Sequence, residues 1–184
     1  MGTVWLAGMT KEAKDTKAVK DGGGKDIDAF ARVIFGEAAN DSEEGKRAIA
    51  DCIINRIKHP AYPNTLSGVL TATTGKGKHM CATLDNKSHG ERYTAAKKAT
   101  HSEHWAYLDS VTAAQEASVG VVLAHALRSD RVDTTGGATQ YVDGTVEAPS
   151  ARLDATLDTK KWQVAGSRQV GERVLGVVTK VEKK

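Results

Sequence analysis

The chain has 184 residues, of which 40% are hydrophobic and 27% charged, as expected for one globular domain of ordinary size. Its net charge of +3 is too small to predict nucleic-acid binding, which requires a concentrated stripe of lysine and arginine. No apolar run approaches the roughly 20 residues that cross a bilayer, so membrane insertion is not expected either.

The first 25 residues are predicted to be a flexible N-terminal arm, and residues 26–184 a single catalytic domain. The arm is rich in lysine, shows little periodicity and ends in the glycine run of DGGGKD. Lysines and acids interrupt its hydrophobic residues, so no secretory signal is expected. The protein is therefore expected to be made in the cytoplasm and to leave it by another route.

Two helices are predicted to follow the arm. The first starts at Asp26, which can cap it, and ends between Gly36 and Ala39. Its helically spaced apolar residues are Ile27, Phe30, Ala31, Ile34 and Phe35. The second starts after an N-cap at Asp41 or Ser42, has two acids in its first turn, and ends before the prolines of HPAYPNT. Its buried stripe is predicted to be Ala48, Ile49, Cys52, Ile53 and Ile57.

The rest of the chain is predicted to form a loop, further helices and a small sheet. Residues 71–91 are rich in glycine and lysine and indicate a loop or loose hairpin, and helices resume over 91–101 and 110–127. The apolar face of the last helix is predicted to be Ala113, Ala117, Val121, Leu123 and Ala124. Short strands are predicted in ATQYVDG, KKWQVAG and RVLGVVTKV. This order predicts an α+β fold, mainly helical, with a small antiparallel sheet in the C-terminal part.

Glu37 is the residue most suggestive of chemistry. A carboxylate at the C-terminal end of a helix lies at the unfavourable end of the dipole, although a solvated side chain at a fraying helix end would explain it equally well. Its neighbours Gly36, Ala38 and Ala39 are small and would let a bulky ligand reach its oxygens. Desolvation beside an apolar helix favours the protonated form of a carboxyl group, as a general acid requires.

The cysteines and histidines do not predict a cofactor. Cys52 and Cys81 can be either two buried hydrophobic residues or a disulfide, and we favour the former. The histidines at positions 79, 89, 101 and 104 have a spacing that is poor for a closed zinc site. No metal site and no other cofactor is therefore expected.

The stretch FARVIFGEAANDSEEGKRAIADCIINRIKHPAYPNTLSGVL, residues 30–70, carries a family resemblance. It resembles the opening of the SleB/CwlJ-type cell-wall hydrolases, the family of spore-cortex-lytic enzymes and their phage relatives. The matching residues are Gly36, Glu37, Ala38, Glu44, Gly45, Asn55, Arg56, Pro60, Pro63, Asn64, Thr65, Gly68 and Val69. The segments HMCATLDNKS, DTTGGATQYV and RQVGERVL resemble later family motifs more weakly.

The resemblance implies a lysozyme-like fold that cuts peptidoglycan between N-acetylmuramic acid and N-acetylglucosamine, with Glu37 as general acid/base. No second catalytic carboxylate is obvious at a fixed spacing, so a lytic transglycosylase is favoured over a muramidase. The mildly positive charge suits an anionic wall as partner. Substrate contacts are expected from Asp41, Asn55, Thr139, Gln140, Tyr141 and Trp162.

Several positions depart from the family pattern. Ala39 stands where the family has arginine, and Asp41 replaces its second glutamate. Gln140 replaces the histidine of the GATHY motif, and a later aromatic residue is missing, for which Trp162 could compensate. On an alternating strand Gln140 would face away from Thr139, and the resemblance favours the face bearing Gln140 for the cleft.

Asn55 and Arg56 have a structural interpretation beside the functional one. Both lie on the second predicted helix, next to its buried isoleucines. The arginine could fix a carboxylate such as Glu44, and the asparagine could tie down a loop. We favour this structural role for the pair.

The alternative function is a catalytically impaired peptidoglycan-binding module of the same fold, because the departures are those that loss of chemistry would leave. As an enzyme, the protein is expected to act in the periplasm or cell wall. It would arrive there through a phage holin as an endolysin, or by injection as an antibacterial effector. An effector would have a cognate immunity protein that could plug the cleft.

Overall fold

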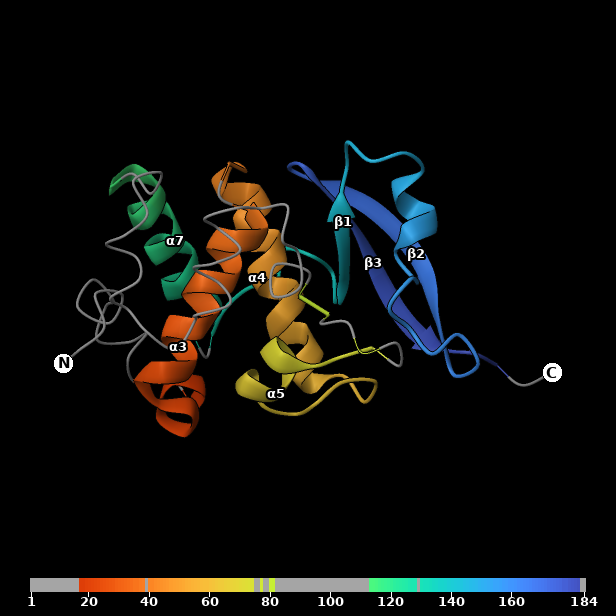
Figure 1. Cartoon of the computed structure of the whole chain (residues 1–184), viewed down its shortest axis with the longest axis horizontal. Coiled ribbons are helices and arrows are strands. Elements are labelled where there is room, and N and C mark those ends of the chain that lie inside the picture. The colour runs from red at the N-terminus through yellow and green to blue at the C-terminus, as the bar shows by residue number, and fades with distance from the viewer. Residues whose placement is uncertain are drawn as a thin grey trace.

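The computed structural model describes residues 17–38, 40–74, 77, 80–81, 113–128 and 130–182. Helices occupy one side of the molecule and strands the other (Figure 1). The helices are α3 (Lys17–Ala38), α4 (Glu43–Lys58), α5 (Leu66–Thr71) and α7 (Ala113–Ala126), with a short 3-10 helix η4 (Pro149–Arg152). The strands are β1 (Gln140–Asp143), β2 (Trp162–Val170) and β3 (Arg173–Lys180). The predicted α+β class, mainly helical with a small antiparallel sheet in the C-terminal part, is confirmed.

Helix α3 starts earlier than predicted. It begins at Lys17 and runs through the glycine run, so the predicted start at Asp26 was wrong. Each glycine inside a helix costs about 1 kcal/mol relative to alanine, but propensity is a weak guide when a packed helix can extend by one hydrogen bond per added residue. The five predicted apolar residues are all buried, and the helix ends at Ala38 as expected. Residues 1–16 of the predicted arm lie outside the described residues.

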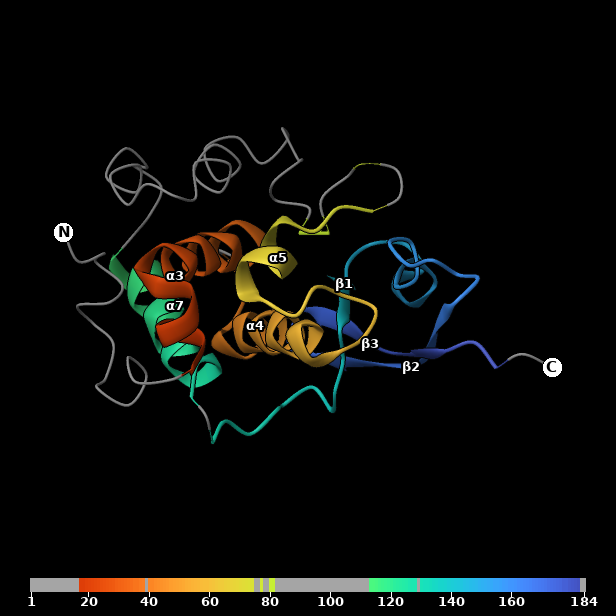
Figure 2. The same cartoon turned by 90° about the horizontal axis from the view of Figure 1, so that it is seen from below.

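Helix α4 lies between the other helices and the sheet (Figure 2). Ser42 is its N-cap, and the Ser42 hydroxyl accepts a hydrogen bond from the Gly45 amide at 3.2 Å. Its bounds and its buried stripe agree with prediction, with Ile57 partly buried. Because α4 is covered on two sides, its buried surface is wider than predicted and includes Asp51 and Arg56.

The remaining helices were predicted less well. Helix α5 was missed, although Thr65 caps it by accepting a hydrogen bond from the Gly68 amide at 3.1 Å. Helix α7 lies within the predicted range, but Val121 is 47% exposed and Val122 is buried instead. The apolar residues of this helix are distributed around its whole circumference, so its sequence does not predict which side is buried. The helix predicted over 91–101 lies outside the described residues.

The three strands form an antiparallel sheet in the order β1-β3-β2. Gln140 of β1 lies opposite Gly176 of β3, and Val170 of β2 lies opposite Arg173. Leu175 joins the sheet to α4 through a small apolar cluster with Ala48, Cys52 and Ala138. Cys52 and Cys81 are both buried and unpaired, as favoured from the sequence.

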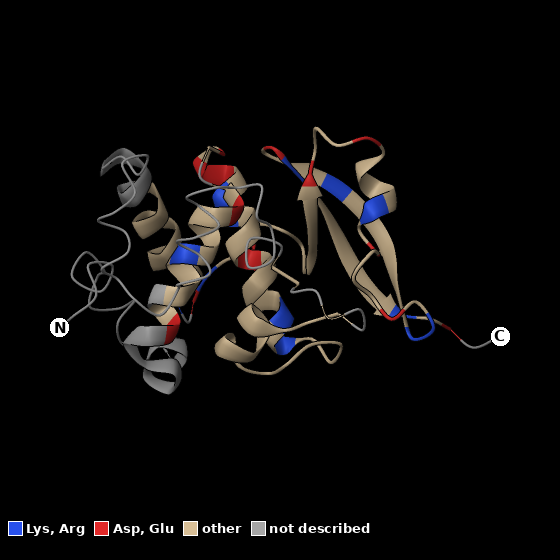
Figure 3. Ribbon diagram, in the orientation of Figure 1, with Lys and Arg blue, Asp and Glu red and all other residues tan. Residues whose placement is uncertain are grey.

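The described helices do not include a membrane-spanning one, and the charged residues of both signs are mixed in the view of Figure 3. None of the described helices is both long and apolar enough to cross a bilayer. Acidic and basic residues are interspersed over the helices and strands in the view of Figure 3. The sheet and helices therefore meet through apolar packing and local polar contacts rather than through opposed charged faces.

Replacing Gly171 is expected to destabilise the junction between the β2–β3 turn and α4. Gly171 has a φ of 54°, and a Cβ there would lie 2.9 Å from the Gly45 backbone nitrogen. A side chain at this φ is strained, and the contacting atom is backbone that cannot swing away. We expect Gly171→Ala to lower the free energy of unfolding by about 1–3 kcal/mol in urea denaturation.

The matched control is Gly166→Ala on β2, where an added Cβ meets nothing within 4 Å. This control should unfold within about 0.5 kcal/mol of wild type. Equal unfolding midpoints for the two variants would contradict the prediction.

Candidate active site

Glu37 lies at the C-terminal end of α3 and is half-buried. Its neighbours Gly36 and Ala38 are buried, so the side chain extends from a closely packed part of the backbone. Its negative charge contributes to the raised pKa values of Tyr141 and Cys81. Glu37 is therefore not a freely solvated residue at a fraying helix end.

Arg173, at the start of β3, holds the backbone of Glu37. Its Nη2 donates to the Glu37 carbonyl oxygen at 2.6 Å. The same guanidinium donates to both carboxylate oxygens of Asp41, at 2.6 Å from Nε and 3.0 Å from Nη2. Arg173 is nearly buried, so this bidentate ion pair is shielded from water. The end of α3, the following loop and the first residue of β3 are thereby tied together.

Asp41 was predicted to contact substrate, but its carboxylate is occupied within the protein. Both oxygens accept hydrogen bonds from Arg173, and its side chain is only 12% exposed. Lys46 donates to its backbone carbonyl. The neighbouring Ser42 donates to the Glu172 carboxylate from its amide at 3.1 Å and from its hydroxyl at 2.9 Å. The contacts of Asp41 are therefore those of a residue that shapes the loop after Glu37.

A buried cluster of Tyr141, Cys81 and Arg56 adjoins Glu37. Burial, with a contribution from the charge of Glu37, raises the pKa of Cys81 to about 11 and holds that of Tyr141 well above its ordinary value. Both groups are therefore neutral near pH 7. The Arg56 guanidinium carbon lies 5.2 Å from the Tyr141 ring centroid and 5.5 Å from that of Tyr62. Hydrogen bonding to Tyr141 and Arg56 lowers the pKa of the Cys81 thiol, but burial outweighs this effect.

Tyr141, rather than Gln140, is the β1 residue beside Glu37. Gln140 Nε2 donates to the Tyr62 hydroxyl at 2.7 Å, and Gln140 Oε1 accepts from Thr156 at 3.2 Å. The Thr139 hydroxyl accepts from the same Tyr62 hydroxyl at 3.3 Å. Thr139 precedes β1, so strict alternation does not apply to it, and both buried side chains reach Tyr62. The expectation that Gln140 faces the cleft is therefore not supported by these contacts.

Asn55 has the structural role considered from the sequence. Its Nδ2 donates to Asp133 at 3.2 Å, to Thr135 at 3.1 Å and to the Ala138 carbonyl at 3.0 Å. Its Oδ1 accepts from Arg131 at 2.7 Å. The Asn55 side-chain amide thus fixes the loop that leads into β1. Both its nitrogen and its oxygen are hydrogen-bonded within the protein.

Arg56 does not make the contact that was considered from the sequence, and Trp162 lies far along the sheet from Arg173. Arg56 does not pair with Glu44, because Arg56 is buried about three turns along α4 from that exposed glutamate and donates instead to the Thr139 carbonyl at 2.7 Å. Trp162 lies at the opposite end of the sheet from Arg173. The structure therefore brings Tyr141 to Glu37 and leaves Trp162 apart from it.

Metal binding finds no support in the described part of the chain. Within the described residues, no group of three histidine, cysteine or acidic side chains could hold a metal ion. The histidines at positions 79, 89, 101 and 104 lie outside those residues.

The loop before β1 is expected to weaken in acid. Burial alone would raise the pKa of Asp133, but hydrogen bonds from Thr135, the Gly137 amide and Asn55 outweigh it and hold the pKa below its ordinary value. Ionised Asp133 therefore stabilises the fold above about pH 4, and this contribution is lost as the pH falls below that value. We expect Asp133→Asn to be less stable than wild type at neutral pH, with the difference shrinking towards about pH 2.5.

The measurement is urea denaturation across this pH range. Asp154→Asn serves as the control, because Asp154 is exposed and has no side-chain hydrogen bond to another described residue. A stability difference between Asp133→Asn and wild type that does not change with pH would rule out this account.

Comparison with known proteins identifies a family. A family model described as Cell Wall Hydrolase matches residues 40–165, beginning three residues after Glu37. The spore cortex-lytic enzyme of Bacillus subtilis is 42% identical over 45 residues, covering 24% of this chain and 15% of that protein. The spore cortex-lytic enzyme of Oceanobacillus iheyensis is 40% identical over 45 residues, covering 24% and 16%. The match thus spans less than a fifth of the length of these relatives.

Two solved structures are also similar. The catalytic domain of the Bacillus cereus SleB protein is 17% identical, with a TM-score of 0.45, over 83% of this chain and 89% of that one. The catalytic domain of a germination-specific lytic transglycosylase SleB from Bacillus anthracis is 18% identical, with a TM-score of 0.46, over 83% and 93%. The family model covers well over half of the chain and confirms the resemblance predicted from the sequence, so the chain belongs to the cell wall hydrolase family.

Proposed function

We propose that this protein cleaves the glycan strands of peptidoglycan between N-acetylmuramic acid and N-acetylglucosamine, with Glu37 as general acid/base. The observation that carries the proposal is the position of Glu37, half-buried at the end of α3 between small residues, with its backbone held by Arg173. Membership of the cell wall hydrolase family supports the class of substrate. The names of the two spore cortex-lytic relatives support it further.

The first step is proton donation to the glycosidic oxygen. Protonated Glu37 supplies this proton as the bond from the muramic acid anomeric carbon to that oxygen breaks and positive charge develops on the sugar ring. Tyr141 and Cys81 hold their own protons firmly near neutral pH, since burial raises their pKa values. They are therefore weak competitors for the role of acid.

The second step restores the proton to Glu37. In the lytic transglycosylase route, the carboxylate takes a proton from the muramic acid hydroxymethyl group, whose oxygen then bonds to the anomeric carbon and closes an anhydro ring. In the muramidase route a water molecule gives its proton to the Glu37 carboxylate, and its oxygen bonds to the anomeric carbon instead. Asp41 follows Glu37 most closely of the described carboxylates, and its pairing with Arg173 makes it a poor nucleophile. This supports a single-acid mechanism and hence the transglycosylase.

Among the residues expected to bind substrate, Tyr141 has the strongest support. Its pKa is raised in part by the charge of Glu37, and its hydroxyl lies next to the Cys81 thiol. We propose that this hydroxyl donates a hydrogen bond to a sugar oxygen when substrate is bound. Asn55, Thr139 and Gln140 would act indirectly, through the loop and strand that they hold in place.

The setting of the activity follows from the proposed substrate. Peptidoglycan lies outside the cytoplasmic membrane, so we propose that the protein acts in the periplasm or cell wall, as a phage lysin or an antibacterial effector. Membership of the cell wall hydrolase family supports such a site of action without separating the two. An immunity protein remains a prediction for the effector alone.

Replacing the proposed acid is expected to abolish cleavage but not binding. Glu37→Gln keeps the size of the side chain and removes its exchangeable acid proton, so clearing of purified sacculi should slow by about a thousandfold. The variant should still sediment with sacculi. Glu43→Gln is the control, since Glu43 is an exposed residue paired with Arg47 at 2.8 Å.

The soluble products distinguish the two chemical routes. Mass spectrometry should find anhydro-muramic ends if the transglycosylase route operates, and reducing muramic ends if water attacks. A wild-type protein that sediments with sacculi and leaves them intact would instead indicate the peptidoglycan-binding module.

Arg173 is expected to position Glu37. Lysine keeps the charge but lacks the planar fork that joins Asp41 and the Glu37 carbonyl at once. We expect Arg173→Lys to lower kcat on soluble glycan fragments by about 10- to 100-fold with little change in KM. The control is Arg168→Lys, which alters an exposed arginine that donates to the Thr134 carbonyl. Unchanged kcat per folded molecule, with lower stability alone, would show that Arg173 is only structural.

A further inference from the structure

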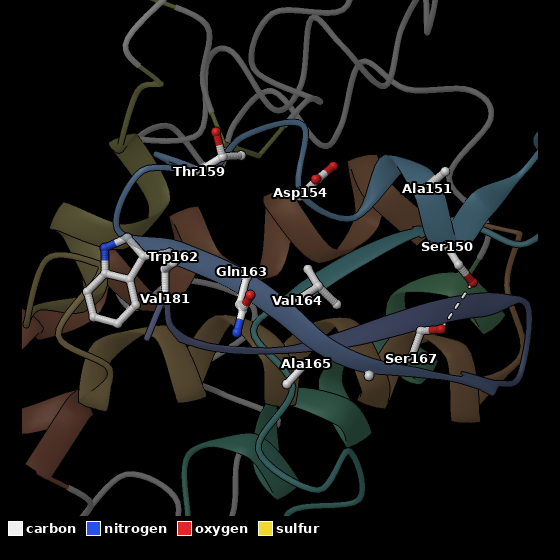
Figure 4. Close-up of a pocket in the computed structure, with 11 residues that line it drawn as sticks. Ser150, Ala151, Asp154, Thr159, Trp162, Gln163, Val164, Ala165, Ser167 and Val181 are labelled. Atoms are coloured by element: carbon white, nitrogen blue, oxygen red, sulfur yellow. Dashed lines mark hydrogen bonds between the residues drawn. The ribbon is translucent and has the colours of Figure 1, made fainter. Parts of the chain in front are cut away.

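A groove of about 470 Å³ lies between β2 and the segment that contains η4 (Figure 4). Ser150, Ala151, Asp154 and Thr159 lie along one side of it, and residues from Trp162 to Ser167 line the other. The lined part of β2 is about 16 Å long at the usual rise of a strand. Its Trp162 end is the end of the sheet remote from Arg173, whereas its Ser167 end is level with Gln140, because both residues lie opposite Gly176 of β3.

Most polar side chains of the groove have no hydrogen-bond partner among the described residues. Asp154, Thr159 and Gln163 are exposed, and their side chains have no hydrogen bond to any other described residue. The Ser150 and Ser167 hydroxyls lie 3.0 Å apart and share one hydrogen bond across the groove. None of the described residues that line the groove is a lysine or an arginine. It therefore offers amide, hydroxyl and carboxylate groups to a ligand but nothing to neutralise a phosphate.

Trp162 forms an aromatic wall at one end of the groove. Its indole is half-buried and packs against His59, with ring centroids 5.1 Å apart and planes tilted by 60°. His59 is itself fixed, because one ring nitrogen lies 3.1 Å from the Val178 carbonyl and the other accepts from the Ala61 amide at 3.1 Å. The indole thus rests on a rigid support, and Trp162 is one of the residues that line the groove.

We propose that this groove binds a segment of a peptidoglycan glycan strand through the rings, hydroxyls and N-acetyl groups of its sugars, as a second contact site distinct from Glu37. A pyranose ring has apolar C–H faces that pack on an aromatic ring and hydroxyl edges that exchange hydrogen bonds with amides, hydroxyls and carboxylates. The groove offers both kinds of group. A phosphate-rich polymer would lack cationic partners here, and an amphipathic helix would require a more apolar lining.

The proposal rests on the proposed function for the choice of glycan, and it adds a consequence. A strand held in this groove stays near Glu37 after each cut, because a second site raises the local concentration of cleavable bonds. The groove should therefore increase activity on long strands in sacculi more than on short soluble fragments.

The test uses Glu37→Gln as the parent protein, so that the ligand survives, and a soluble oligomer of N-acetylglucosamine as the probe. Titration followed by amide NMR should shift residues 162–167. Adding Gln163→Ala, or Gly166→Gln to fill the groove, should weaken binding at this site by about tenfold or more. An added Cβ at Gly166 meets nothing within 4 Å, so this change should leave the fold intact.

The control is Gly120→Gln on α7, another glycine at which an added Cβ meets nothing within 4 Å. Trp162→Ala should also weaken binding, although it removes the packing on His59 as well, and unfolding midpoints are measured for every variant. Shifts confined to the neighbourhood of Tyr141, or unchanged binding by the two groove variants, would overturn the proposal.

The groove proposal and the proposed function can fail independently of each other. If groove variants lose the oligomer while wild type leaves sacculi intact, the groove proposal holds and the proposed function fails. If wild type clears sacculi and the groove variants bind and clear them equally well, the proposed function holds and the groove proposal fails. Capture of a protein partner by the groove without binding of the oligomer would also overturn it.

Discussion

The arrangement around Glu37 depends on one guanidinium. Arg173 spans from the Asp41 carboxylate to the Glu37 carbonyl, and so it joins the end of the first described helix to the start of the central strand. A nearly buried bidentate pair of this kind has a strong orientational preference, because both hydrogen bonds must be satisfied together. The position of the proposed acid is thus set by the sheet as much as by the helix that carries it.

Helix α4 provides the scaffold on which this arrangement rests. Its apolar residues pack against the other helices and against the sheet, while Asn55 and Arg56 fix the backbone that leads into β1. Arg56 is buried against two tyrosine rings without a carboxylate partner among the described residues, so its charge depends on carbonyl and aromatic contacts. This side of the molecule holds Tyr141 close to Glu37.

Features with local causes were predictable from the sequence, and features with distant causes were not. The bounds of α4 follow from the Ser42 cap and the prolines after it, and the three strands follow from alternation and glycine turns. The pairing of Asp41 with Arg173 joins residues 132 positions apart, and the sequence around either residue does not predict it. The motif favours the face bearing Gln140 for the cleft, but it does not predict the contact of Gln140 with Tyr62, which lies 78 positions away.

The most direct measurement is a crystal structure of Glu37→Gln bound to a peptidoglycan fragment that contains the scissile linkage. The account predicts that the amide at position 37 lies about 3 Å from the bridging oxygen between the two sugars, with the phenol of Tyr141 on the same fragment. A fragment whose linkage is bound elsewhere, with position 37 touching no sugar, would contradict the account.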